Sequence, residues 1–196
     1  MLFKKYNQLL VKMVGTVQLP DKKGKFVLLL LTGTKYEKYM PSFLGHFLET
    51  HKKICFVSSA MTWDMLKDMF KKSGLDISRI IFVDTLSSYY GDKVDTKNCL
   101  FVKNPYDFDL LKTTIQHAII ESGCKGILFD SVSDFWSQKY TMDLYKLMNS
   151  LVTEKHFSDK TKWLCLVKQV APGDYHERTK DFAMLANKVL HLNSER

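Results

Sequence analysis

Short apolar runs alternate with longer amphipathic stretches along the chain, and this alternation restricts the possible folds more than any other feature. The run from Phe26 to Leu31 is apolar at every position and has the length of a strand buried on both faces. From Tyr36 to Thr50 the apolar residues recur three or four positions apart, which is typical of a helix with one buried face. The same two patterns predict further helices over 61–72, 107–122, 142–155 and 179–185, and further strands over 53–58, 79–84, 99–102, 125–130, 161–167 and 188–192.

Strands that are apolar on both faces and alternate with helices favour a mainly parallel sheet. Helices should cover both faces of that sheet, so the expected fold class is α/β with three layers, α/β/α. Gly74 and Gly123 stand where helices should end, and Asp107 can cap the helix that follows it. The 196 residues contain no repeat or linker, so 1–196 is expected to form a single domain with 1–25 as a peripheral N-terminal segment.

The net charge of +8 is concentrated in the first half of the chain. Residues 1–98 hold 16 Lys and Arg against 9 Asp and Glu, whereas residues 99–196 hold 13 against 12. A basic half can attract nucleic acid or an acidic partner. However, most of its lysines come in pairs, such as Lys52-Lys53, with no interleaved aromatic residues, so a solvated basic face is the leading interpretation.

The composition also bears on the expected location of the protein. No apolar run approaches the roughly 20 residues that cross a bilayer, so no membrane span is expected. The four cysteines, at positions 55, 99, 124 and 165, are far apart and lie in or beside apolar stretches. They are expected to be reduced and buried, in a cytoplasmic protein, and they have no metal-ligand spacing.

The loop after the first strand has part of a phosphate-binding pattern. Such a loop needs glycine at its first and sixth positions, then a lysine, then a serine or threonine that holds Mg²⁺. Counted from Gly33, the last three of these positions hold Lys38, Tyr39 and Met40. Only the first glycine is present, so the loop does not meet the requirements for gripping a triphosphate.

Polar residues also follow the other strands, at the edge where ligands bind in open parallel sheets. Ser58-Ser59 offers hydroxyls without a partner base, and Asp84 ends the third strand. Asp130 follows three apolar residues and precedes Ser131, so it is either a carboxylate that supports a metal-bound water or a turn-forming residue. The sequence leaves these two interpretations open.

The order of these segments resembles the RecA-like ATPases, in particular the KaiC-like branch common in archaea, from about Phe26 to Leu192. Gly126-Ile-Leu-Phe-Asp130-Ser131 is similar to the Walker B strand of that family, and the segment from Leu185 to Leu192 is similar to its last strand. The resemblance implies the topology of a P-loop NTPase. It also implies a degenerate nucleotide site that includes Gly33, Asp130 and Ser131.

The departures from the family pattern determine the expected function. The Walker A lysine and hydroxyl are absent, and Ser58-Ser59 replaces the catalytic glutamate pair that the family has after its second strand. Hydrolysis would lack two of its main electrostatic contributions. We therefore expect a pseudo-ATPase with no catalytic residue, no metal and no cofactor, ATP with Mg²⁺ being the less favoured option. It would act as a regulatory or scaffold module that binds a protein, either a second copy or a KaiC-like ATPase assembly.

Two other functions remain open from the sequence. The basic N-terminal half could make the chain a nucleic-acid-binding module. Alternatively, the chain could retain nucleotide binding or catalyse another reaction at the strand ends with Asp84 and Asp130, for example as a transferase.

Overall fold

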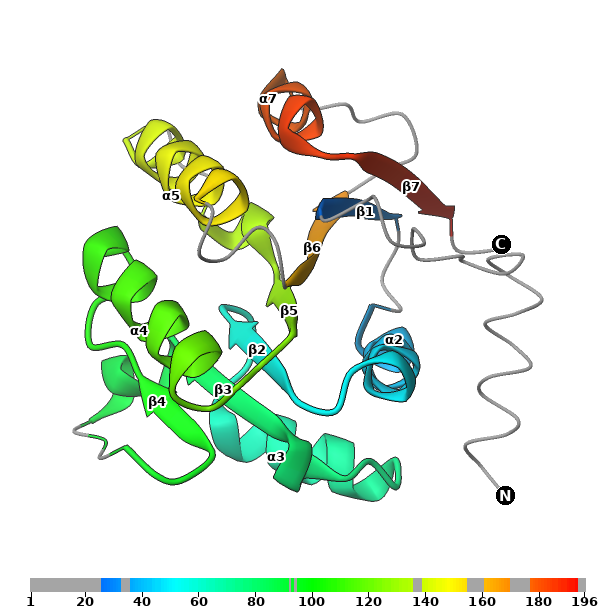
Figure 1. Cartoon of the computed structure of the whole chain (residues 1–196), viewed down its shortest axis with the longest axis vertical. Coiled ribbons are helices and arrows are strands. Elements are labelled where there is room, and N and C mark those ends of the chain that lie inside the picture. Colours follow the sequence, from blue (N-terminus) through cyan, green and yellow to red (C-terminus); the bar gives the residue numbers. More distant parts are fainter. Residues whose placement is uncertain are drawn as a thin grey trace.

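The computed structural model describes residues 26–32, 36–91, 93, 95–135, 139–154, 161–169 and 177–193. In this part of the chain, seven strands form one sheet (Figure 1). The expected segment 1–25 and Gly33 lie outside the described residues. The strands are β1 (Phe26–Thr32), β2 (Ile54–Ser58), β3 (Ile80–Asp84), β4 (Cys99–Phe101), β5 (Gly126–Asp130), β6 (Lys162–Gln169) and β7 (Lys188–Asn193).

The strand order is β4-β3-β2-β5-β6-β1-β7, and every neighbouring pair is parallel. All positions of β2, β3 and β5 are buried, which explains why these strands are continuously apolar up to their last residue instead of alternating. Because β1 pairs with β6 and β7, the chain must cross β6 and β5 to reach β2. The carboxyl ends of all seven strands therefore lie at one edge, and their amino ends lie at the other.

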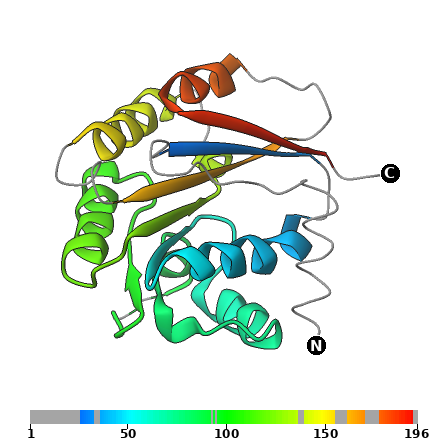
Figure 2. The same cartoon turned by 45° about the vertical axis from the view of Figure 1, so that its right-hand side comes forward.

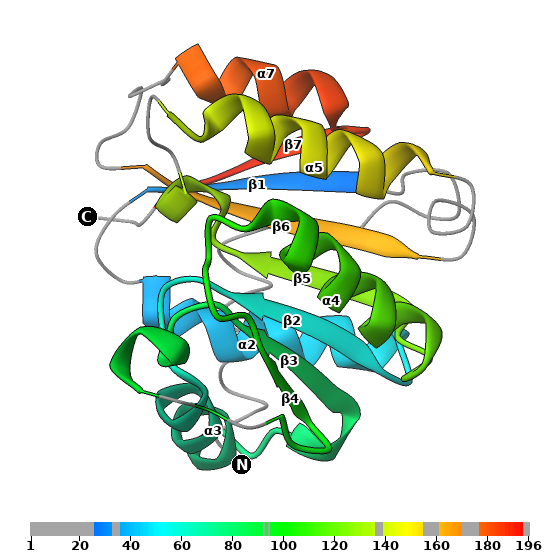
Figure 3. The same cartoon turned by 90° about the vertical axis from the view of Figure 1, so that its left-hand side faces the viewer.

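Helices cover both faces of the sheet, so the expected three-layer arrangement is confirmed (Figure 2). One face packs against α2 (Tyr36–Thr50) and α3 (Trp63–Lys72). The other face packs against α4 (Phe108–Ile120), α5 (Thr141–Thr153) and α7 (Glu177–Leu185), which lie in front of the strands in Figure 3. The described part of the chain contains no helix that is long and apolar enough to cross a membrane.

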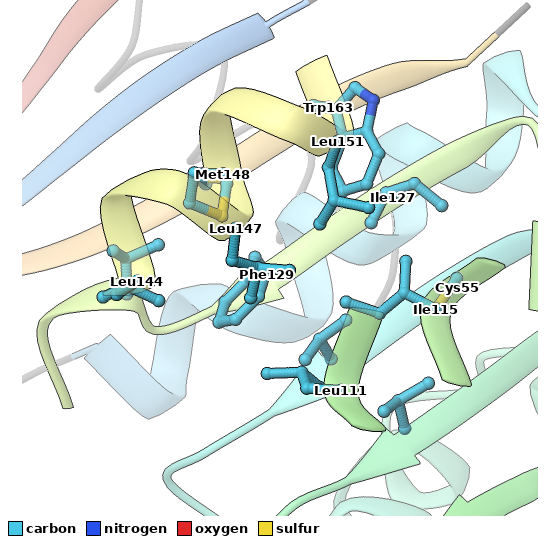
Figure 4. Close-up of a cluster of buried hydrophobic side chains, with 14 of the residues drawn as sticks. Cys55, Leu111, Ile115, Ile127, Phe129, Leu144, Leu147, Met148, Leu151 and Trp163 are labelled. Atoms are coloured by element: carbon cyan, nitrogen blue, oxygen red, sulfur yellow. The ribbon is translucent and has the colours of Figure 1, made fainter. Parts of the chain in front are cut away.

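The core beneath α4 and α5 is a continuous layer of side chains (Figure 4). Phe129 on β5 lies against residues of both helices, and Trp163 on β6 is only 1% exposed. All four cysteines are free and buried. Burial raises the pKa of the Cys55 thiol well above its usual value, so this group behaves as a small apolar residue.

The helix ends follow local rules that the sequence shows. Gly74 and Gly123 have φ angles of +74° and +70°, in the left-handed region where glycine has no steric penalty. The side chain of Asp107 accepts a hydrogen bond from the Leu110 amide and caps α4, as expected. At α3 the N-cap residue is Thr62, whose side chain makes no capping hydrogen bond.

Candidate functional site

The polar residues at the carboxyl edge lie level with one another on adjacent strands. Ser58 at the end of β2 is in register with Asp84 on one side and with Asp130 on the other. All three side chains are buried. The sheet therefore brings together the residues that the sequence placed at separate strand ends, and their hydrogen bonds distinguish their roles.

Asp84 is saturated by hydrogen bonds. Its Oδ1 accepts from the amides of Leu86 and Ser87 at 2.8 Å each. Its Oδ2 accepts from the Trp63 amide at 2.6 Å and from the Ser87 hydroxyl at 2.5 Å. A carboxylate with four donors in a buried setting is a structural anchor, and both of its oxygens are already occupied. This arrangement weighs against the alternative in which Asp84 takes part in catalysis.

Asp130 is in the opposite situation. Its side chain is fully buried, and neither carboxylate oxygen has a hydrogen-bond partner among the described residues. Burial raises the pKa of this carboxyl group to about 8, and the nearby positive charge of Lys168 offsets only part of the effect. The group is therefore held largely as a neutral acid near pH 7.

Ser59 connects the segment that follows β5 to the end of β2. Its Oγ accepts a hydrogen bond from the Ser131 amide at 2.8 Å and lies 2.9 Å from the Ser131 carbonyl oxygen, 3.0 Å from the Asp130 carbonyl oxygen and 3.0 Å from Oδ2 of Asp134. Asp134 belongs to the short 3₁₀ helix η3 (Val132–Phe135). These contacts hold η3 close to the end of β2.

A second set of contacts attaches η3 to β6. Nζ of Lys168 lies 3.2 Å from Oδ2 of Asp134, and the Lys168 amide donates to the Ser133 hydroxyl at 3.1 Å. The Ser131 and Ser133 hydroxyls are 2.8 Å apart. Thus η3 is fixed to the strands on both sides of β5, directly after the buried Asp130.

Not all of the residues suggested by the sequence can be placed at this edge. Gly33 is outside the described residues, so its proposed role stays a prediction, as do those of Asp130 and Ser131. The ion pair between Asp134 and Lys168 was not expected, although the sequence puts a carboxylate after one strand and an amine at the end of the next. Tyr89 and Tyr90, in the 3₁₀ helix η2 (Ser87–Tyr90), are 58% and 77% exposed, so they do not cover the core.

The described residues fit a metal-nucleotide site poorly. They contain no group of three or more His, Cys, Asp or Glu side chains arranged to hold a metal ion. Asp130 is a single carboxyl group held neutral by burial, and Asp84 has no free oxygen. In nucleotide sites Mg²⁺ is bound by phosphate oxygens, waters and one or two ionised carboxylates, and a carboxyl group that stays protonated is a weaker ligand.

A surface groove of about 670 Å³ lies between α4 and α5, and its lining contains none of the strand-end residues discussed above. It is lined by both acidic and basic side chains, among them Asp109, Asp143, Lys112 and Lys146. Lys112 pairs with Glu154, and Lys146 pairs with Asp143. These ion pairs leave the groove without a strong preference for one sign of charge.

Comparison with known proteins supports the fold. No family model and no curated protein matches the chain. Solved structures do match, among them that of a KaiC-like protein from the hyperthermophilic archaeon Pyrococcus horikoshii OT3, with a TM-score of 0.61 at 15% identity, over 87% of this chain and 72% of that one. At this level of identity the likeness shows the fold alone. The chain shares the parallel α/β fold of this KaiC-like protein, so the expected fold class is confirmed.

Proposed function

We propose that this chain is a RecA-like domain that has lost nucleotide hydrolysis and acts by binding a protein partner. The state of Asp130 is the observation that carries the proposal. Its carboxyl group has no partner in the described residues, and burial raises its pKa to about 8. A neutral acid enclosed in this way is a poor support for a metal-bound water.

The surroundings of Asp130 support the same interpretation. Hydrolysis also needs a base that orients the attacking water. At the end of β2, where the resemblance would place that base, the residue is Ser59, whose hydroxyl is engaged by the segment after β5. Asp134, the nearest other acid in the hydrogen-bond network, is paired with Lys168. The degenerate loop from Gly33 to Met40, which we infer from its sequence, adds to this argument.

Exposed apolar residues at the carboxyl edge favour a protein partner. Tyr90 is 77% exposed, Tyr89 is 58% exposed, and Met65 in the first turn of α3 is also 58% exposed. Asp84 holds the start of α3 and the start of η2 together, so these side chains extend from two elements that share one anchor. Tyrosine and methionine are enriched at the centres of protein interfaces. We infer that the partner is a second copy of this chain or another RecA-like subunit.

The first half of the proposal is tested with the full chain and nucleotide. Isothermal titration with ATP and Mg²⁺, together with a phosphate-release assay, should give neither micromolar binding nor turnover. Mg²⁺-dependent hydrolysis that disappears in Asp130→Asn but persists in Asp109→Asn, a change at an exposed acid on α4, would refute the loss of activity.

The second half is tested by self-association. Sedimentation velocity over a range of concentrations should show an oligomer for the wild type and a weaker one for the double variant Tyr89→Ser/Tyr90→Ser. Met184→Ser, which removes a side chain that is 80% exposed on α7, is the matched control and should change nothing. A monomer at all concentrations would rule out the second copy as partner, and an equal effect of the two variants would rule out the tyrosine surface.

A further inference from the structure

We propose that the amino edge of the sheet, opposite the candidate site, binds the phosphodiester backbone of a nucleic-acid duplex through a row of three lysines. These residues are Lys53, Lys125 and Lys162, and we call them the lysine row. The inference does not depend on the proposed function, because that function concerns the carboxyl edge.

The lysine row is built by the strand order. Lys53 directly precedes β2, Lys125 directly precedes β5, and Lys162 is the first residue of β6. These three strands are consecutive neighbours in the sheet. The Lys125 amide donates to the Lys53 carbonyl at 3.1 Å, and the Lys162 amide donates to the Lys125 carbonyl at 2.9 Å. Neighbouring strands are about 4.8 Å apart, so the backbones of the three lysines span about 10 Å of the edge. Lys162 is in register with Gly126, the residue after Lys125, so its side chain leaves the sheet on the face opposite that of Lys53 and Lys125.

Further cations extend the positive charge beyond the row. Arg79 directly precedes β3, the neighbour of β2 on the other side. Its guanidinium donates to the carbonyls of Leu48, His51 and Lys52, so it closes the end of α2 while keeping its charge at this edge. Helix α3 runs from the carboxyl edge to the amino edge, and its last turn carries two more cations, Lys71 and Lys72.

Among the described residues, the carboxylates at the same edge form no ion pair with the lysine row. Asp76 accepts hydrogen bonds from the amide and hydroxyl of Ser78, and its charge interacts with that of Arg79. Glu154 is paired with Lys112. Glu49 is paired with His46, and Glu121 is exposed after α4. Within the described residues, none of the three lysines of the row forms an ion pair.

The charge of the row acts on buried groups beneath it. Burial lowers the pKa of His51, and the positive charge of Lys162 lowers it further. Burial raises the pKa of Cys124 to about 12, and the charges of Lys53 and Lys125 oppose that rise. Lys162 therefore acts on a group next to α2, whereas Lys53 and Lys125 act on a group of the core on the other face, so the positive charge reaches this edge from both faces of the sheet.

The backbone of a duplex fits this surface better than single-stranded nucleic acid or a membrane surface does. A duplex carries about one phosphate per 1.7 Å of its axis, so several phosphates lie within reach of cations spread over about 10 Å. Single-strand binding relies on aromatic rings that stack with bases. Among the described residues, the strongly exposed tyrosines Tyr89 and Tyr90 follow β3, at the opposite edge. Membrane-surface binding uses an amphipathic helix with a basic polar face, whereas these lysines lie at strand starts.

The sequence suggested a basic N-terminal half, but the fold groups the charges differently. Lys125 and Lys162 come from the nearly neutral second half of the chain and become neighbours of Lys53 only because β5 and β6 lie beside β2. The positive surface to be tested is therefore the amino edge of the sheet and not the N-terminal half of the sequence.

The test uses the full chain and fluorescently labelled DNA and RNA duplexes of about 20 base pairs, with anisotropy measured between about 50 and 200 mM salt. The wild type should bind independently of sequence, with an affinity that falls steeply with salt. The triple variant Lys53→Gln/Lys125→Gln/Lys162→Gln should bind at least about tenfold more weakly, and its salt slope should decrease by about 0.9 for each phosphate that the variant no longer neutralises. The single variant Lys125→Gln, at the centre of the row, should show part of this weakening.

The matched control removes the same charge from the opposite edge. Lys93, Lys103 and Lys139 are exposed, and changing all three to Gln should leave duplex binding within about twofold of the wild type, because phosphate contacts depend on position as well as on net charge. No binding at low salt, or equal weakening in both triple variants, would overturn the proposal. It would also be overturned if the wild type bound vesicles containing phosphatidylserine but no duplex. Thermal melting confirms that the variants are folded.

Discussion

The backbone N–H of Trp63 donates to Oδ2 of Asp84 across 2.6 Å, so the first turn of α3 is capped by a strand that comes 21 residues later in the sequence. The same carboxylate also holds η2 through the amide and hydroxyl of Ser87. Asp84 therefore fixes two elements that leave the carboxyl edge.

We predict that Asp84→Ala lowers the free energy of unfolding by about 3 kcal/mol or more, because several buried donors lose their acceptor and each costs about 1–3 kcal/mol. Urea denaturation followed by circular dichroism measures the change. Asp68→Ala, at an exposed position on α3, should change the free energy of unfolding by less than about 0.5 kcal/mol. Equal effects of the two substitutions would show that Asp84 is not an anchor.

The sequence was sufficient to predict most of the secondary structure, because the signals there are local. Continuous apolar runs correspond to strands buried on both faces, and Gly74 and Gly123 end their helices with positive φ angles. Asp107 caps α4 by accepting a hydrogen bond from the amide of Leu110, three residues later, which is also a local contact. These features depend on neighbours in the chain, so the pattern of one sequence reveals them.

The chemistry of the strand ends could not be predicted in the same way. Asp84 and Asp130 are both the last residues of buried strands, yet one accepts four hydrogen bonds and the other accepts none from the described residues. The difference depends on whether donors from distant segments reach each carboxylate. The lysine row depends on strand order for the same reason, since Lys53 and Lys162 are more than 100 residues apart in the chain.

His51 provides a test of the positive field at the amino edge. Burial, and then the charge of Lys162, lower the pKa of this residue below 6.5, while its hydrogen bond to the Phe47 carbonyl acts in the opposite direction. The folded chain therefore binds the proton less readily than the unfolded chain. The stability that this group contributes is present above pH 6.5 and is lost as the pH falls below that value.

We predict that Lys162→Gln raises the pKa of His51, because one of the two causes that lower it is removed. An NMR titration of the His51 ring measures the change, and Lys139→Gln, on the opposite edge, should leave the titration unchanged. If the pKa of His51 stayed the same or fell in Lys162→Gln, the lysine would not act on this site.

Gly126 shows how closely α2 approaches the start of β5. A Cβ atom at this position would lie 2.6 Å from Cε1 of Phe47 and 3.1 Å from Cγ of His51. We predict that Gly126→Ala lowers the free energy of unfolding by about 1–3 kcal/mol through overpacking. Phe47→Leu combined with Gly126→Ala should lower it by less than the sum of the two single changes, because the ring that collides has gone. Strictly additive effects in urea denaturation would contradict this explanation.

Asp130 gives the clearest dependence of stability on pH. Burial raises the pKa of this carboxyl group from 3.8 to about 8, so between these values the folded chain keeps a proton that the unfolded chain has released. The unfolded state binds fewer protons in this window, and therefore the stability contributed by this group decreases as the pH rises. The slope approaches about 1.4 kcal/mol per pH unit for one proton. The decrease should level off above about pH 8.

We predict that Asp130→Asn removes this slope, because the amide does not ionise. The free energy of unfolding of the variant relative to the wild type should rise by several kcal/mol as the pH increases from about 5 to 8, whatever the offset between the two proteins at pH 5. Urea denaturation at a series of pH values measures the difference, with Asp109→Asn as an exposed control that should run parallel to the wild type. Parallel curves for Asp130→Asn and the wild type would show that Asp130 is ionised in the folded protein near pH 7. A hydrogen-bond donor or a cation would then stabilise the ionised Asp130 carboxylate. In that case the argument against a metal-nucleotide site at this edge would fail.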